Sequence, residues 1–288
     1  HGYPETTTMP RKVVVDHDTR TMSVVYNFRV GDKTRFGVIE QTGSAYIIKS
    51  WPKMISPFDN GEVFSDRQLN KLSTRVIATG VFDSATSVLA KDKTSNDDGT
   101  VTRNVILNVE QGDINTVTGE VGYSTTDGSG VDLSYERRNF IGYAQTLLLS
   151  TTLKTNQIRL AADYNIPYFF REDRALDLGA EIAREDTDAF TGEKVGVNGL
   201  LTQKLSSKLK IGLGAGLEAS RFKEDGEDIT AYLFDGLGRA TYDSRNSILD
   251  PVKGIHVEAS AVPTYNFGEE DGLFTTAQIG ASTYRRAS

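Results

Sequence analysis

Apolar and polar residues alternate one by one from about Asp113 to the end of the chain. In LKIGLGAGLEAS, residues 209–220, the odd positions are Leu, Ile or Ala and the even positions are Lys, Gly, Glu or Ser. Successive side chains of a strand point to opposite faces, so a period of two indicates strands with one apolar face. The pattern predicts about ten strands of about 9 to 12 residues, separated by turns such as TDGSG, REDR and EDGED.

The first third of the chain contains helical patterns as well. Residues 35–43 alternate as a strand, and SAYIIKSWP, residues 44–52, is predicted to be a short helix that Pro52 ends. In residues 65–82 a longer helix is predicted, because Leu69, Leu72 and Val76 recur at helical spacing. Ser65 or Asp66 is its candidate N-cap, and Gly80 is its stop.

Two further strands are predicted at residues 85–90 and 101–109, joined by the polar turn KDKTSNDDGT. The resulting order β-α-α-β-β predicts a three-stranded mixed sheet covered by two helices. SVVYNFRVGD, residues 23–32, resembles NVILNVEQGD, residues 104–113, and each is predicted to be an alternating strand that ends at a Gly-Asp turn. The spacing between these two similar segments predicts repeated units of about 80 residues, of which the first is incomplete.

Composition narrows the classes of function. No run of about 18 apolar residues is present, which excludes a transmembrane helix but not a membrane barrel, whose strands are half polar. The net charge of -7 argues against a nucleic-acid partner. The absence of cysteine removes disulfides and thiolate chemistry. The chain begins HGYPETTTMP, without an initiator Met or an apolar signal segment, so a mature or excised piece is expected.

The apolar face of the predicted strands must be covered by something. Strands of about 9 to 12 residues cross a bilayer when they are tilted, whereas strands of soluble sandwiches are usually shorter. An apolar exterior around a charged, glycine-rich interior is the arrangement of an outer-membrane barrel. A soluble β-rich binding module, in which a second sheet covers the apolar face, is the other interpretation.

Three stretches carry a resemblance to a known family. FDNGEVFSDRQLNKLSTRVIATGVFDSATSVLA resembles the part of a POTRA domain in which a Gly turn leads into the long helix. GEVGYSTTDGSGVDLSYERRNFIGYAQTLLLS resembles a first barrel hairpin with its E-x-R-N-x-x-G turn, and YDSRNSILDPVKGIHVEAS resembles a segment of the surface-antigen barrel. The chain is thus similar to the outer-membrane barrel-assembly superfamily, in which POTRA domains precede a barrel of about 16 strands, and most similar to its TamA branch.

This resemblance implies an α+β POTRA domain (β-α-α-β-β) followed by an antiparallel transmembrane β-barrel, of which about ten strands are present. Residues 1–33 are expected to be the C-terminal part of a preceding POTRA domain, residues 34–113 a complete one and residues 114–288 the first portion of the barrel. Family members have about three POTRA domains, and this chain ends ASTYRRAS rather than on an aromatic residue. Closure of the barrel is therefore not expected within it.

The function implied is a non-enzymatic factor, without a cofactor or metal, that assists insertion or secretion of outer-membrane proteins such as autotransporters. The implied location is the Gram-negative outer membrane, with POTRA domains in the periplasm. Outer-membrane lipid, a TamB-like periplasm-spanning protein and nascent outer-membrane proteins are the implied partners. The alternative is a polypeptide-secreting pore of the two-partner secretion type.

Two groups of site residues follow from the resemblance. The first barrel strand, residues 116–124, is expected to be a lateral gate that pairs with client strands, with glycines that let another backbone approach. Its residues are Thr116, Thr118, Gly119, Glu120, Gly122 and Tyr123. The second group shapes turns, with Asp243 and Arg245 expected as an ion pair. Its residues are Arg138, Asn139, Gly142, Asp243, Arg245, Asp250, Pro251 and Gly254.

Other groups of residues resemble binding or catalytic motifs but have a structural explanation. GLGAG, residues 212–216, is spaced G-x-G-x-G, and no helix follows it to bind a phosphate, so small residues facing a crowded lumen are favoured. The acidic clusters DHD at 16–18 and NDDG at 96–99 are weighed as metal sites and assigned to turns. Ser244, Asp243 and His256 contain the residue types of a hydrolase triad, but the chain has no Gly-x-Ser-x-Gly elbow.

Overall fold

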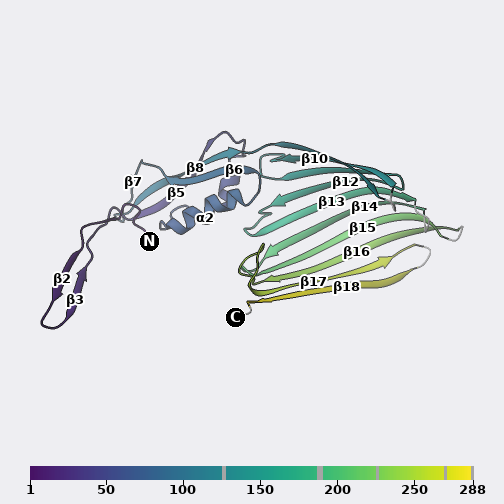
Figure 1. Cartoon of the computed structure of the whole chain (residues 1–288). Coiled ribbons are helices and arrows are strands. Elements are labelled where there is room, and N and C mark those ends of the chain that lie inside the picture. The colour runs from purple at the N-terminus through teal and green to yellow at the C-terminus, as the bar shows by residue number, and fades with distance from the viewer. Residues whose placement is uncertain (125–127, 187–190, 225–226, 269–270, 287–288) are drawn as a thin grey trace. The chain divides into compact units, whose positions relative to one another are not determined.

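The computed structural model describes residues 1–124, 128–186, 191–224, 227–268 and 271–286. The chain divides into two compact units, His1–Gly112 and Asp113–Ser288. The first unit contains helices and short sheets, and the second is one antiparallel sheet (Figure 1). Each unit is described by itself below.

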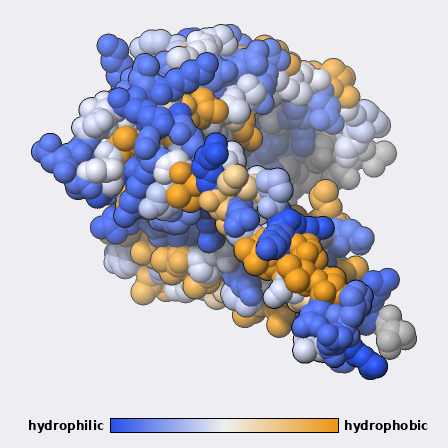
Figure 2. Space-filling view, turned by 90° about the vertical axis from the view of Figure 1, so that its left-hand side faces the viewer, coloured by the Kyte–Doolittle hydropathy of each residue, from blue (hydrophilic) through white to orange (hydrophobic). Residues whose placement is uncertain are grey.

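A two-stranded ribbon extends from the first unit. In it β1 (Thr7–Thr8) pairs with β4 (Phe28–Arg29), and β2 (Lys12–Asp16) pairs with β3 (Thr21–Val25). The sequence predicted one strand over residues 23–32, but the structure breaks it between β3 and β4. Asp16 closes the hairpin turn, since its Oδ1 accepts hydrogen bonds from the backbone N–H groups of Asp18 and Thr19. Figure 2, which looks at the left-hand side of Figure 1, shows a surface on which hydrophilic residues predominate and hydrophobic residues gather in several separate patches.

The main sheet of the first unit is mixed. β5 (Thr34–Gly43) pairs in parallel with β8 (Val101–Gln111), and β6 (Phe82–Leu89) pairs antiparallel with β8. A fourth, two-residue strand, β7 (Thr94–Ser95), also pairs with β8. The predicted sheet of three strands was therefore short by one strand, because the segment assigned to a polar turn contains β7. The backbone N–H of Asn96 also donates to the carbonyl of Thr100 there.

Two helices belong to this unit, α1 (Trp51–Ile55) and α2 (Asp66–Ile77). The prediction for α1 was wrong, because Pro52 lies in its first turn and begins the helix instead of ending it. Proline is well tolerated there, where its missing N–H has no intrahelical partner to lose. The long helix is confirmed, and it buries the predicted Leu69, Leu72 and Val76. Neither helix in the described part of the chain combines the length and the apolar character needed to cross a membrane.

The first unit has a conventional core. Phe36, Trp51, Ile55 and Leu72 are almost completely buried. The Phe36 ring stacks on Phe58 with 3.8 Å between ring centroids. Inward residues alternate along β8, as expected for a strand with one buried face.

The second unit is a ten-stranded antiparallel meander, in which every strand pairs with the next one along the chain. The ten strands predicted from the alternation are confirmed. Its strands are β9 (Asn115–Ser124), β10 (Gly128–Arg138), β11 (Thr146–Lys154), β12 (Gln157–Pro167), β13 (Arg174–Asp186), β14 (Thr191–Lys204), β15 (Leu209–Glu224), β16 (Glu227–Asp243), β17 (Lys253–Asn266) and β18 (Gly272–Arg285). β9 and β18 are the two edges of the sheet.

The register sorts side chains cleanly onto two faces, because residues directly opposite each other in a sheet share a face. One row of partners across seven strands is Leu133, Thr151, Leu160, Ile182, Val195, Ala219 and Tyr232. The neighbouring row on the other side is Asp132, Thr152, Arg159, Ala183, Lys194, Ser220 and Ala231. We call the first side the apolar face and the second the polar face.

Candidate functional site

The first edge of the large sheet is fully open. β9 pairs with β10 alone, so the backbone groups on its other side have no strand beside them in the described chain. Its apolar-face side chains are exceptionally exposed: Val117 by 75%, Val121 by 81% and Tyr123 by 78%. An exposed edge of ten residues is a template on which another strand can pair.

The residues expected to form a gate all lie on β9, but they divide between the faces. Thr116, Thr118, Glu120 and Gly122 lie on the polar face, whereas Gly119 and Tyr123 lie on the apolar face. No described atom lies within 4 Å of the position that a Cβ on Gly122 would take, and at Gly119 the nearest atom is Leu133 Cδ2 at 3.4 Å. The contacts within the sheet therefore do not demand glycine at either position.

The polar face carries a chain of charges across four strands. Arg159 Nε on β12 donates to Glu181 Oε2 on β13 at 2.9 Å. The other oxygen of Glu181 lies 2.6 Å from Lys194 Nζ on β14, and Lys194 lies 3.9 Å from Glu218 on β15. Each of these side chains is partly exposed, so water screens the pairs and each contributes modestly to stability.

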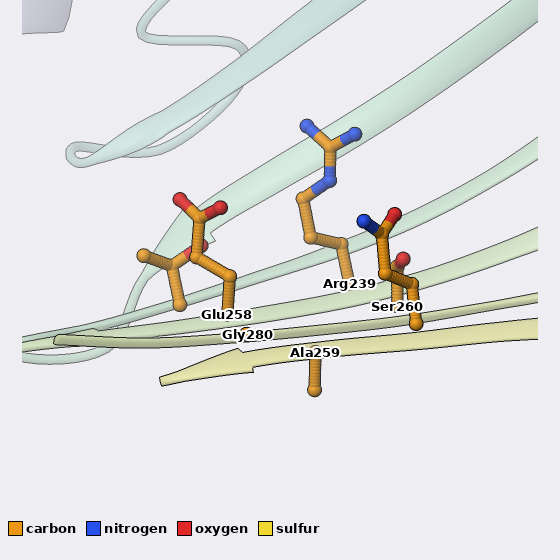
Figure 3. A pocket seen from close by; sticks show the side chains of 7 residues that line it. Arg239, Glu258, Ala259, Ser260 and Gly280 are labelled. Atoms are coloured by element: carbon orange, nitrogen blue, oxygen red, sulfur yellow. The ribbon is translucent and has the colours of Figure 1, made fainter. Parts of the chain in front are cut away.

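A cavity of about 250 Å³ lies against the polar face near the other edge. Its lining includes Arg239 on β16, Glu258 on β17 and Gln278 on β18. Figure 3 shows Arg239 and Glu258 projecting to the same side of the sheet and Ala259 projecting to the opposite side. The lining of this cavity consists mainly of hydrogen-bonding and charged groups of the polar face.

The turn between β10 and β11 contains the first group of predicted turn residues. Arg138 forms an ion pair with Glu136 at 3.1 Å. Asn139 adopts φ +53° and is nearly buried, and its Oδ1 accepts a hydrogen bond from the N–H of Ala144. Gly142 adopts φ +89°, which favours glycine. These contacts and backbone angles fix the conformation of the turn.

The turn between β16 and β17 contains the second group. Arg245 binds Asp243 through both its Nε and its Nη2, at 2.6 to 3.1 Å, and through its backbone N–H. Gly254 adopts φ +123°, and a Cβ there would lie 2.4 Å from the carbonyl oxygen of Ser244. The backbone N–H of Asp250 donates to Ser247 Oγ, and Pro251 follows it within the turn. These hydrogen bonds and the glycine backbone angle fix the conformation of this turn.

The hydrolase interpretation of this turn has no support in the geometry. Ser244 Oγ donates to the carbonyl of Ile255 and accepts from its N–H, so it is committed to the backbone. The carboxylate of Asp243 holds Arg245, and His256 Nδ1 lies 3.4 Å from it without a hydrogen bond. Among the described residues, no three His, Asp or Glu side chains group as metal ligands would.

The structure does not bring the gate residues and the turn residues between β16 and β17 together. The gate residues lie on the first strand of the sheet, and the Asp243–Arg245 pair lies seven strands away at the end of β16. Sequence reasoning missed the charge chain from Arg159 to Glu218. Its only sequence signal is that each member falls on the polar side of an alternating strand, and pairing them needs the register of three hairpins.

Comparisons with known proteins agree with this architecture. The Omp85 superfamily domain matches residues 139–286. The structure of BamA from Haemophilus ducreyi lacking POTRA domains 1-3 is similar with a TM-score of 0.72, at 14% identity, over 98% of this chain and 62% of that chain. CdiB from Acinetobacter baumannii has a TM-score of 0.52 at 13% identity, over 96% of this chain and 53% of that chain. CdiB from Escherichia coli has a TM-score of 0.55 at 15% identity, over 100% of this chain and 56% of that chain. At these identities the likeness concerns the fold, and this chain spans about three fifths or less of each structure.

Proposed function

Because the chain belongs to the Omp85 superfamily, we propose that it assists the insertion or secretion of outer-membrane proteins such as autotransporters, as a non-enzymatic factor in the Gram-negative outer membrane. The observation that carries the proposal is the open strand β9, at the first edge of a sheet with one apolar and one polar face. A client strand that pairs with β9 gains main-chain hydrogen bonds, and its side chains meet both faces.

The dimensions of the apolar face support a place in a membrane. On β13 the apolar face runs from Arg174 to Arg184 and holds Leu176, Leu178, Ala180 and Ile182 between them. Ten residue steps of about 3.3 Å span about 33 Å, or about 25 Å when the strand is tilted by about 40°. Barrels of the outer membrane have an apolar band of about that height.

We assign residues 34–113 to a POTRA domain, and the support is that β5, α1, α2, β6 and β8 follow one another as in the expected β-α-α-β-β layout, with the two-residue strand β7 added before β8. We place this domain in the periplasm and assign residues 1–33 to a preceding copy. The TamA branch, and with it a TamB-like periplasm-spanning partner, is our proposal for the place of this chain within the superfamily. Its support is the three stretches that resemble that branch.

Cysteine cross-linking tests the role of β9, since the chain has no cysteine of its own. We expect Thr118→Cys in the full-length protein to form a disulfide with single cysteines in the last strand of an arrested autotransporter. The matched control is Asn198→Cys on β14, which also lies on the polar face but has strands on both sides. Depletion of the protein should also lower autotransporter levels at the surface of cells with a sensitised principal assembly machinery.

The alternative, a polypeptide-secreting pore of the two-partner secretion type, is favoured by the likeness to the two CdiB structures. The pore predicts cross-links at both positions, because a polypeptide that threads the lumen passes the whole polar face. Cross-links to a secreted polypeptide at Asn198→Cys, equal to those at Thr118→Cys, would favour the pore. Unchanged autotransporter levels with no cross-link at β9 would exclude the assembly role.

A further inference from the structure

The charged residues that border the apolar face differ between its two ends. We define the turn rim as the end at which β9 begins and β10 ends, and the hairpin rim as the opposite end. At the turn rim the charged residues on the apolar face are all cationic. They are Arg137, Arg174, Lys253 and Arg285, and the other strands end that face there on uncharged residues.

At the hairpin rim both signs of charge are present on the apolar face, and they neutralise one another. Arg184 on β13 pairs with Glu193 on β14 at 3.3 Å. Arg221 on β15 pairs with Asp228 on β16 at 2.9 Å. Lys223, a further cation of the described part of this rim, is the register partner of Asp228. The hairpin rim therefore has acidic side chains beside its cations on the apolar face, whereas the strand residues of the turn rim carry only positive charge there.

Two of the turn-rim cations face each other. Lys253 on β17 and Arg285 on β18 are direct register partners, and both are exposed. Like charges directly opposite on one face destabilise a sheet. No acidic side chain in the described chain forms an ion pair with either, so an anion from outside would relieve the repulsion.

The surroundings of this pair indicate what kind of anion fits. Going from the rim toward the middle of the apolar face, the next partners are Ile255 with Thr283, and then Val257 with Ala281. A free phosphate would use only the two cations, but an amphiphile would use the cations and the apolar strip beside them. We propose that Lys253 and Arg285 bind the phosphate of an anionic phospholipid, whose acyl chain lies along Ile255 and Val257.

The proposal rests on the proposed function, because it needs the apolar face to lie in a bilayer. Phosphatidylglycerol fits better than a zwitterionic lipid, because its headgroup has a net negative charge. The ammonium group of a zwitterionic headgroup would be repelled by the two cations. Arg137 and Arg174 extend the belt around the rim. A basic residue close to a membrane surface strengthens binding of an anionic lipid by about fivefold.

The test is native mass spectrometry of the full-length protein in detergent micelles, titrated with phosphatidylglycerol or phosphatidylcholine. We expect wild type to bind phosphatidylglycerol about fivefold more tightly than phosphatidylcholine. Lys253→Gln combined with Arg285→Gln should abolish that preference. Arg184→Gln combined with Arg221→Gln removes two cations from the hairpin rim and should retain it.

Each other outcome overturns the proposal. Equal binding of both lipids by wild type would exclude it, as would an unchanged preference in the Lys253→Gln, Arg285→Gln variant. Displacement of phosphatidylglycerol by 10 mM inorganic phosphate, roughly the level of an ordinary buffer, would assign the pair to free phosphate. The heat-dependent shift in gel mobility is measured first on every variant. Its absence from wild type would contradict the proposed barrel, and with it the proposed function, and not only the lipid site.

Discussion

The two units of this chain treat their apolar side chains in opposite ways. In the first unit Phe36, Trp51, Ile55 and Leu72 are removed from solvent almost completely. In the second unit the described hydrophobic residues that are fully buried are only Ala144, Ala183 and Ala231, while Leu213 and Ile279 are exposed by 68% and 76%. Apolar side chains are therefore buried against one another in the first unit, whereas in the second unit they form an exposed face that needs an apolar covering.

The difference decides what stabilises each unit. Burial of apolar area against other side chains is the main favourable contribution in the first unit. The second unit is held by backbone ladders between ten neighbouring strands, by the turns that set their register, and by whatever covers the apolar face. Mutations in the two units should accordingly act by different mechanisms.

The largest effect is expected from the core of the first unit. Leu72→Ala removes a side chain that is 0% exposed and leaves a cavity between α2 and its neighbours, so it should cost about 3 to 4 kcal/mol. Trp51 is the only tryptophan of the chain and lies in this core, so its fluorescence reports urea unfolding of this unit. Ile77→Ala on the same helix, at a position exposed by 40%, is the control and should cost much less.

A charge on the apolar face of the second unit should have the next largest effect. Leu217→Arg at the middle of β15 should disfavour folding into a bilayer by about 2 to 3 kcal/mol, and in water it would be nearly silent. Thr202→Arg on β14 places the same charge on the polar face and is the control. The measurement is urea unfolding in lipid vesicles, followed by heat-dependent gel mobility. Equal midpoints for both variants would remove the distinction between the faces.

Much of this contrast was predictable from the sequence. Alternation assigns each residue of a regular strand to a face, so Leu209 to Ser220 needed no structure to be sorted. The placement of α1 could not be predicted, because a proline fits the first turn of a helix as well as the position after its end. The ion pair of Glu181 with Lys194 could not be predicted either, since a shift of two residues in the β13–β14 register keeps every side chain on its face and changes which side chains are neighbours.

A smaller effect is expected at the turn between β16 and β17. Gly254→Ala should destabilise the second unit by about 1 to 3 kcal/mol, because φ is +123° and the new Cβ would meet the carbonyl of Ser244. Gly238→Ala in the preceding strand is the control, since its nearest neighbour would be the Ala261 oxygen at 3.9 Å. Unfolding midpoints in vesicles should fall for the first variant only. An equal fall in both would mean that loss of strand glycines, and not the turn geometry, is responsible.

The smallest effect is electrostatic and belongs to the first unit. Hydrogen bonds from the Thr100 hydroxyl and backbone, with a further bond from Arg35, lower the pKa of Asp98 from 3.8 to about 2. A carboxylate whose pKa is lower in the folded state stabilises the fold while it is ionised. That stabilisation is complete above the unfolded pKa and is lost as the pH falls through the folded value.

Asp98→Asn should therefore lower the Trp51-monitored unfolding midpoint at pH 6, and the difference from wild type should shrink as the pH falls from about 4 to about 2. Asp97→Asn removes the same charge from the adjacent residue and should show no such convergence. Because Asp98 is exposed, high salt should reduce the contribution of Arg35 and leave that of Thr100. A difference between wild type and Asp98→Asn that stays constant with pH would show that the turn depends on the shape of this side chain and not on its charge.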